Sequence, residues 1–86
     1  MVACGAGACG KLYRRAIEAG ATFYLTGEMG HHDLLYSAAA GMTVVCIGHA
    51  QSERPVLPAL AARMRRALPG LAVALAGGDA ESFQIV

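Results

Sequence analysis

Short apolar runs alternate along the chain with stretches of helical periodicity. Strands are predicted for the apolar runs at residues 1–4, 22–26, 43–47 and 71–76. Helices are predicted for the amphipathic stretches between them, at residues 11–19, 31–40 and 52–68. This β-α-β-α-β-α-β order favours an α/β fold in which helices cover a mainly parallel sheet.

The ends of the predicted helices carry recognisable signals. Gly20 and Gly41 each follow a predicted helix and are expected to close it as C-cap glycines. Ser52 is expected to be the N-cap of the third helix, with Pro55 in its first turn. One face of that helix carries the apolar residues Leu57, Leu60, Ala61, Met64 and Leu68.

Two segments bear on the shape of the sheet. The run at residues 43–47, Thr-Val-Val-Cys-Ile, is β-branched and apolar throughout, which predicts an interior strand covered on both faces. The tail at residues 77–86 fits no single element. Its last part, residues 82–86, is expected either to form an edge strand or to dock on a neighbour.

Composition narrows the class of protein. A chain of 86 residues allows one small domain, taken here as residues 1–86. With 56% hydrophobic and 15% charged residues it is too apolar for a disordered segment. A net charge of +1 argues against a dedicated nucleic-acid binder. No apolar stretch approaches the roughly 20 residues of a membrane span, and no charged leader indicates a signal peptide.

The cysteines and the apolar surface add two expectations. Cys4, Cys9 and Cys46 form no CxxC pair, so neither a disulfide framework nor a four-ligand structural zinc site is expected. We expect reduced, mostly buried thiols in a cytoplasmic protein. Because so small a domain buries a limited share of its surface, its many apolar residues predict a partner, either another subunit in a homo-oligomer or a missing half of the protein.

Candidate chemistry gathers in the loops that follow the predicted strands, at residues 5–10, 27–32 and 48–53. Functional groups of parallel sheets collect at this edge, and these loops hold all three histidines. His49 leaves a buried strand and Glu53 follows four residues later, a pair that suits a divalent metal such as Zn, Mn or Fe. The alternative is a capping carboxylate beside an ordinary loop histidine.

The segment from Glu28 to Asp33 is the second candidate. Adjacent helical side chains diverge by about 100°, so His31 and His32 are not both expected to ligate one ion. Glu28, at a strand end, is expected either to act as a general base or to orient a histidine. The alternative is the first turn of a helix, where acidic residues are favoured by the helix dipole.

The third candidate is the glycine pattern at residues 5–10, Gly-Ala-Gly-Ala-Cys-Gly, between a strand and a helix. It matches the phosphate-cradling turn of dinucleotide-binding folds, with Glu28 at the position of a ribose-binding acid. A plain tight turn explains the same glycines.

Together the motifs resemble a known family. Cys4-Gly5-Ala6-Gly7, the segment Thr26-Gly27-Glu28 with His31-His32-Asp33, and Gly48-His49 with Ser52-Glu53 occur in the order and spacing of the C-terminal half of the Nif-three-like dinuclear metal-centre proteins. Some members of that family are regarded as type 2 GTP cyclohydrolase I homologues. The resemblance runs from about residue 2 to residue 75. A smaller departure is Thr22, where the family usually has Asp.

The resemblance implies an α/β fold of two similar lobes with a two-metal site between them, of which this chain is one lobe. His49 and Glu53 fall on metal ligands of the family. Glu28, His31 and His32 line the same cleft, either on the substrate side or as groups that contact the ligands. The other lobe supplies the remaining ligands from a His-His-Pro segment and an Asp. Neither is present in this chain, so the N-terminal lobe is expected to be missing from it. The family also forms ring-like assemblies.

Three functions remain open. In the first, the chain is the metal-binding lobe of a dinuclear metal-dependent hydrolase acting on a small molecule. His49 and Glu53 then hold metal, while Glu28, His31 or His32 handles protons as catalytic groups, with at least one of the two adjacent histidines in the cleft of His49. In the second, it is a non-enzymatic scaffold that binds metal or a partner. In the third, it is half of a nucleotide-binding fold that uses residues 5–10 and Glu28.

Overall fold

The computed structural model describes residues 1–84 and 86. The chain divides into two compact units, Met1–Glu53 and Arg54–Val86, and each is described by itself. No helix in the described part of the chain has the length and apolar character needed to cross a membrane.

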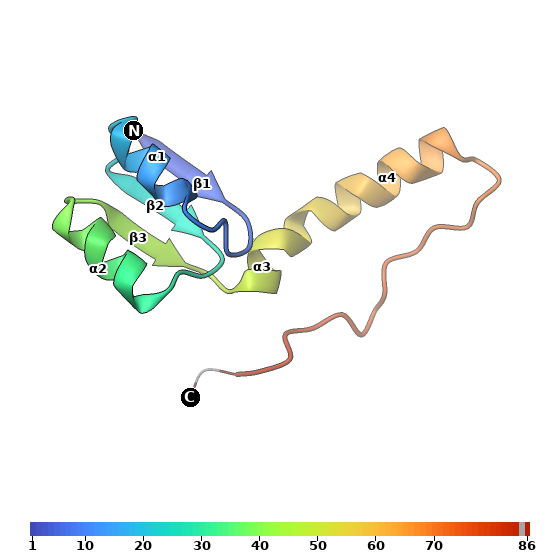
Figure 1. Cartoon of the computed structure of the whole chain (residues 1–86). Coiled ribbons are helices and arrows are strands. Elements are labelled where there is room, and N and C mark those ends of the chain that lie inside the picture. The colour runs from blue at the N-terminus through green and yellow to red at the C-terminus, as the bar shows by residue number, and fades with distance from the viewer. Residues whose placement is uncertain (85) are drawn as a thin grey trace. The chain divides into compact units, whose positions relative to one another are not determined.

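The first unit is a three-stranded parallel sheet with helices. Strands β1 (Val2–Gly5), β2 (Phe23–Thr26) and β3 (Thr43–Cys46) pair in the order β1-β2-β3. Helices α1 (Leu12–Glu18) and α2 (His31–Ala39) form the two crossovers and lie on one side of the sheet (Figure 1). A short helix, α3 (His49–Glu53), follows β3. The predicted α/β fold with parallel strands and covering helices is confirmed for this unit.

The core lies between the sheet and these two helices. It consists of Tyr13, Ala21, Tyr24 and Met42, each at most 6% exposed. Several apolar side chains pack against it while partly exposed: Ala3, Ala16, Ile17, Met29 and Val44. Two tyrosines therefore supply most of the buried volume of a very small core, and burial raises the pKa of the Tyr24 hydroxyl.

Both crossover helices end as the sequence predicts, in glycine-terminated caps. Gly41 has φ 77°, its N–H donates to the Ala38 carbonyl at 3.0 Å, and the Met42 N–H donates to the Ser37 carbonyl at 3.0 Å. This is the Schellman arrangement, and Gly20 closes α1 in the same way with φ 84°. Each cap satisfies carbonyls of the last helical turn and turns the chain directly into the next strand.

The face of the sheet opposite α1 and α2 is apolar. Alternation along the strands places six side chains there: Val2, Cys4, Phe23, Leu25, Thr43 and Val45. Val2 is 70% exposed and Val45 37% exposed. A parallel sheet is normally covered on both faces, so this surface stands out as uncovered apolar area.

The second unit consists of a 3₁₀ turn, η1 (Arg54–Val56), the helix α4 (Leu57–Ala67) and an extended tail. Arg54 donates to both carboxylate oxygens of Asp79, at 2.8 and 3.0 Å, and this contact lowers the pKa of Asp79. Arg65 donates to the Val73 carbonyl. Polar contacts of this kind, rather than strand pairing, tie the tail to the helix.

Two predictions about strands are wrong. Residues 43–47 do not form an interior strand, because β3 pairs only with β2 and lies at an edge of the described sheet. Ile47 there is 44% exposed. Residues 71–76 form no strand, since a strand requires a paired neighbour and the Val73 carbonyl instead accepts from Arg65. Residues 82–84 are not in a strand either, and residue 85 of that predicted segment lies outside the described residues.

Two further expectations are corrected. Ser52 is not an N-cap: it lies inside α3, and the predicted long helix is divided into α3, η1 and α4. The thiols are not mostly buried, because Cys4 and Cys46 are exposed and Cys9 is intermediate.

Replacing Gly41 by Ala is expected to lower the free energy of unfolding by about 1 kcal/mol, because an L side chain at positive φ is strained. A Cβ at Gly41 would stand in open space, so the cost comes from the backbone alone. Urea unfolding followed by circular dichroism measures the change. Gly41→Asn is the matched control and should lose less, since Asn tolerates this conformation. Equal losses in the two variants would contradict the backbone explanation.

Candidate metal centre

The loops that follow the three strands meet at one edge of the sheet, around the backbone of Gly7. The Gly7 carbonyl accepts the N–H groups of Gly27 at 3.0 Å and Glu28 at 3.2 Å, and the buried Thr26 hydroxyl at 3.2 Å. The Gly7 N–H donates to the Ser52 hydroxyl at 2.7 Å. These contacts join the β1–α1 loop to the β2–α2 loop and to α3.

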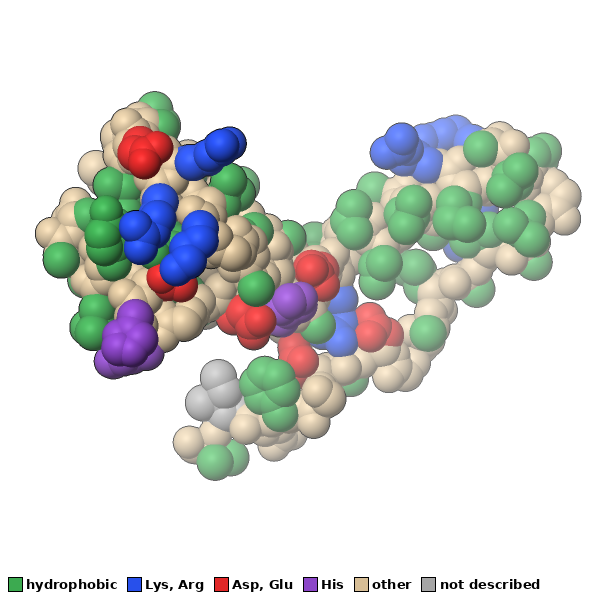
Figure 2. All heavy atoms as spheres, in the orientation of Figure 1, with side chains coloured by type: hydrophobic (Ala, Val, Ile, Leu, Met, Phe, Trp, Pro, Cys, Tyr) green, Lys and Arg blue, Asp and Glu red, His purple; other side chains and the backbone are tan. Residues whose placement is uncertain are grey.

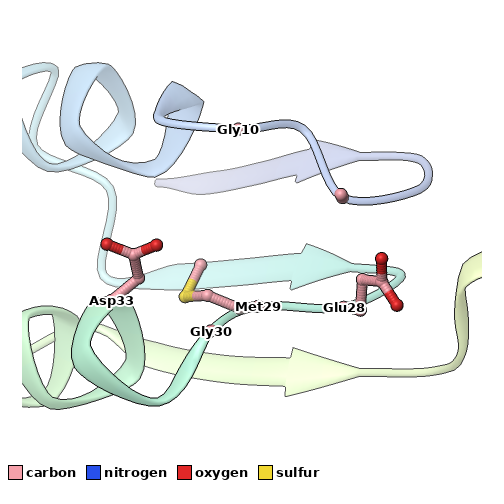
Figure 3. A pocket seen from close by; sticks show the side chains of 6 residues that line it. Gly10, Glu28, Met29, Gly30 and Asp33 are labelled. Carbon is pink, nitrogen blue, oxygen red and sulfur yellow. The ribbon is translucent and has the colours of Figure 1, made fainter.

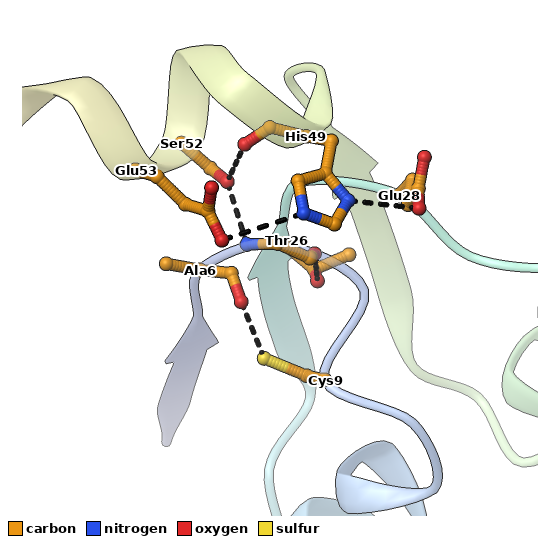
Figure 4. Close-up of polar contacts among 8 residues, drawn as sticks. Ala6, Cys9, Thr26, Glu28, His49, Ser52 and Glu53 are labelled. Carbon is orange, nitrogen blue, oxygen red and sulfur yellow. Dashed lines mark hydrogen bonds and ion pairs between the residues drawn. The ribbon is translucent and has the colours of Figure 1, made fainter.

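His49 lies between two carboxylates at this edge. Its Nδ1 is 2.9 Å from Oε1 of Glu28, and its Nε2 is 3.4 Å from Oε1 of Glu53 (Figure 4). His49 and Glu53 are the first and last residues of α3, and their i,i+4 spacing places both side chains on one face of it. The structure thus brings together the two residues that the sequence proposes as metal ligands, and it adds Glu28.

The Glu28 contact selects a tautomer of His49. A carboxylate only accepts, so the proton of the neutral imidazole resides on Nδ1 and donates to Glu28. The lone pair is then on Nε2, directed to the side of the ring where Glu53 lies. A carboxylate that holds one histidine nitrogen while the other faces outward is the usual environment of a metal-binding histidine.

The space next to Nε2 is kept open by Gly7. A Cβ at Gly7 would stand 2.7 Å from Oε1 of Glu53 and 3.2 Å from Nε2 of His49. Gly7 also has φ 68°, which side chains rarely adopt. The backbone of the glycine loop therefore lies directly beside Nε2 of His49 and Oε1 of Glu53.

His31 and His32 begin α2 and contact each other. Their ring centroids are 5.5 Å apart in an edge-to-face arrangement, and both residues are exposed. Figure 2 shows the histidine side chains of this face in two separate groups. The catalytic role of His31 and His32 remains a prediction.

An open pocket of about 410 Å³ adjoins this site (Figure 3). It lies between the glycine loop and the start of α2, and its lining residues are Ala8, Gly10, Glu28, Met29, Gly30 and Asp33. Glu28 belongs to both places, because it lines the pocket and contacts His49. Glu28 is therefore the residue that connects this pocket with His49.

Asp33 is held at the far side of the pocket by α1. Its Oδ1 accepts the Tyr13 hydroxyl at 2.6 Å and the Lys11 ammonium at 3.3 Å. The Tyr13 hydrogen bond, followed by Lys11, lowers the pKa of Asp33. The Tyr13 hydroxyl in turn accepts from Nε of Arg14 at 3.1 Å. Asp33 is thus an ionised group that fastens α2 to α1.

The glycine loop does not have the free amides of a phosphate cradle at its centre. The Gly7 N–H is used by Ser52, and the Gly7 carbonyl by the β2–α2 loop. The contact between Gly7 and Ser52 spans 45 residues. No local pattern in the sequence indicates it, which is why Ser52 was interpreted only as a helix cap.

A complete metal site is not formed by the described residues alone. Among them, no group of three or more His, Cys, Asp or Glu side chains is arranged to hold an ion. His49 and Glu53 nevertheless fit as two ligands of one ion: donors bound at about 2.1 Å in a tetrahedral site lie about 3.4 Å apart. That is the observed separation of Nε2 and Oε1, 3.4 Å.

Comparison with known proteins identifies the family. The family described as Duf34/NIF3 (NGG1p interacting factor 3) matches residues 1–81. The chain belongs to this family. The resemblance drawn from its motifs is thereby confirmed at the level of the family.

Individual NIF3 relatives match over shorter segments. NIF3-like protein 1 of Mus musculus is 48% identical over 40 residues, 46% of this chain and 11% of that protein. The human protein of the same name is 49% identical over 37 residues, 43% of this chain and 10% of its own length. The NIF3 homolog of Schizosaccharomyces pombe is 43% identical over 37 residues, 43% of this chain and 13% of its own. The matches thus span about a tenth of these relatives. No solved structure matches the chain.

Replacing Tyr13 by Phe is expected to reduce the loss of stability on acidification. The lowered pKa of Asp33 stabilises the fold above the ordinary carboxyl pKa of about 3.9, and this contribution disappears as the pH falls through the lowered value. Without the Tyr13 donor the pKa of Asp33 moves back toward the ordinary value. The free energy of unfolding, measured by urea titration from neutral to strongly acidic pH, should therefore fall less in the variant.

Tyr36→Phe is the matched control for this experiment. Tyr36 contacts the Tyr13 ring edge-on at 6.0 Å and lies under the Arg14 guanidinium, contacts that a phenyl ring retains. This control should keep the pH dependence of the wild type. Identical acid profiles for wild type and Tyr13→Phe would show that the Tyr13 hydroxyl does not set the pKa of Asp33.

Proposed function

We propose that this chain supplies a His–carboxylate half of a divalent metal site in a metal-dependent hydrolase of the NIF3 family. The supporting observation is the 3.4 Å separation of Nε2 of His49 and Oε1 of Glu53 over the backbone of Gly7. His49 and Glu53 are the proposed ligands. The ion is Zn²⁺, Mn²⁺ or Fe²⁺, which accept mixed nitrogen and oxygen ligands.

The remaining ligands must come from elsewhere. Two protein donors do not make a tight site, and the described residues offer no third group in reach. In this proposal the chain is one lobe of a two-lobe protein, and the other lobe completes the coordination. A metal bound there supplies Lewis acidity and an activated water, which suits hydrolysis of a phosphate ester or a purine-type ring.

The other residues have distinct proposed roles. Glu28 orients His49 by accepting its Nδ1 proton, and it also lines the adjoining pocket, where a substrate would meet its carboxylate. His31 and His32 are exposed at the start of α2 and are proposed to handle protons on the substrate side of the cleft. A small molecule is the expected substrate, because the pocket of about 410 Å³ is of that size.

Metal binding is tested on the full chain with Mn²⁺, whose paramagnetism broadens nearby amide signals in NMR spectra even when binding is weak. The amides of Gly7 and Glu53 should broaden first. His49→Ala and Glu53→Ala should each raise the Mn²⁺ concentration required by at least tenfold, because each removes one of two ligands. Glu28→Gln should raise it about tenfold, the usual effect of losing the partner that orients a ligating histidine.

Glu18→Ala is the control, since it removes an exposed carboxylate from α1 without touching the site. It should leave the broadening unchanged. Broadening centred away from Gly7 and Glu53, or an unchanged response in both ligand variants, would return His49 and Glu53 to the role of loop histidine and capping carboxylate.

The second candidate function, a partner-binding scaffold, is favoured by the apolar sheet face opposite α1 and α2. We propose that a second copy of the chain covers this face.

Sedimentation velocity should show an assembly larger than a monomer. Val45→Lys places a charge on that face and should therefore shift the assembly toward the monomer. Glu18→Lys, on exposed α1, should not. A wild-type monomer at high concentration would refute this proposal.

A further inference from the structure

Beyond the proposed ligands, we infer that Ser52 is a positioning residue that sets the orientation of His49 through the backbone of Gly7. This inference rests on the proposed function for its consequence, metal affinity. The geometry that carries it is a closed ring of hydrogen bonds through Gly7, Glu28, His49 and Ser52.

The ring starts and ends at His49. The Ser52 hydroxyl donates to the His49 carbonyl at 2.7 Å and accepts the Gly7 N–H at 2.7 Å. The Gly7 carbonyl accepts the Glu28 N–H at 3.2 Å. The Glu28 carboxylate accepts the Nδ1 proton of His49 at 2.9 Å. The backbone and the ring of His49 are therefore both linked, by different routes, to the backbone of Gly7.

Ser52 is the member of this ring that links α3 to the glycine loop. Its hydroxyl uses its single proton and a lone pair at once, which an alanine cannot replace. Removing the hydroxyl leaves the N–H of the buried Gly7 without that hydrogen-bond partner. An unpaired buried N–H is energetically unfavourable, so the glycine loop is expected to shift. Movement of Gly7 displaces Glu28, and Glu28 is what holds the imidazole.

The close approach of the loops depends on a second glycine. A Cβ at Gly27 would stand 2.5 Å from the Ser52 hydroxyl oxygen and 2.7 Å from the Gly7 carbonyl oxygen. Gly27 and Gly7 thus leave room for the Ser52 hydroxyl between the two loops. The Ser52 hydroxyl occupies the space that the absent side chain of Gly27 leaves open. This fit is consistent with a positioning role for Ser52.

Thr26→Val is the matched control for Ser52→Ala. The Thr26 hydroxyl also bonds the Gly7 backbone, at its carbonyl, and is buried, but it is not a member of the ring. Both variants lose one hydroxyl hydrogen bond to the backbone of the same residue, Gly7. A purely structural role predicts that both lower stability and neither changes His49.

The readout is the tautomer of His49 in the metal-free protein, measured by long-range nitrogen–proton correlation NMR at about pH 9, where an imidazole is neutral. The wild type and Thr26→Val should show the Nδ1–H form. Ser52→Ala should show a mixture of both forms, and Ser52→Thr should restore the wild-type form. In Mn²⁺ titrations, Ser52→Ala should lower affinity by up to about tenfold, the effect expected for Glu28→Gln, and Thr26→Val should not.

A wild-type tautomer and affinity in Ser52→Ala would overturn the inference. Should Ser52→Ala fail to fold, amide hydrogen exchange of the wild type decides: Gly7 must be protected, and rapid exchange there refutes the Ser52 contact. If the wild type binds no Mn²⁺ at this edge, the proposed function fails. The tautomer comparison still decides whether Ser52 positions His49.

Discussion

The arrangement of this edge of the sheet depends on the backbone of one residue, Gly7. Its N–H is bonded to α3 through Ser52, and its carbonyl receives donors from the β2–α2 loop. The other segments can bond the backbone of Gly7 only if they approach within hydrogen-bond distance, and side chains at Gly7 or Gly27 would prevent this. Gly7 and Gly27 therefore allow the close contact between these loops.

The local elements were predictable where local chemistry decides them. Gly20 and Gly41 terminate helices because only their positive φ allows the chain to turn into the next strand. The position of a strand within a sheet is decided by its neighbours, and no property of residues 43–47 reports how many strands pair with them. For the same reason residues 71–76, although apolar, form no strand in the described chain. Apolar, β-branched composition indicates a segment that is suited to burial, whether or not a partner is present.

The site was predictable in part for the same physical reason. His49 and Glu53 are four residues apart, so a single short helix suffices to bring them together. The contact between Glu28 and His49 spans 21 residues and depends on the conformation of two loops. The sequence therefore did not decide whether Glu28 acts as a general base or orients a histidine. The structure shows that the Glu28 carboxylate contacts Nδ1 of His49. The predicted N-cap role of Ser52 was wrong because its hydroxyl accepts the distant N–H of Gly7 instead of an N–H in its own helix.

The electrostatics of this edge favour a cation. Two carboxylates flank one imidazole, and the side chains of His49, Glu28 and Glu53 are each about half exposed, at 49%, 57% and 53%. Water at such exposure solvates both charges, so the fold tolerates them without the penalty of a buried, unpaired carboxylate. The same exposure weakens the attraction of the pair for an ion. Tight binding of an ion therefore requires further ligands and the exclusion of water from this edge. In the proposed two-lobe protein, the surface that supplies those ligands would set the affinity for the ion.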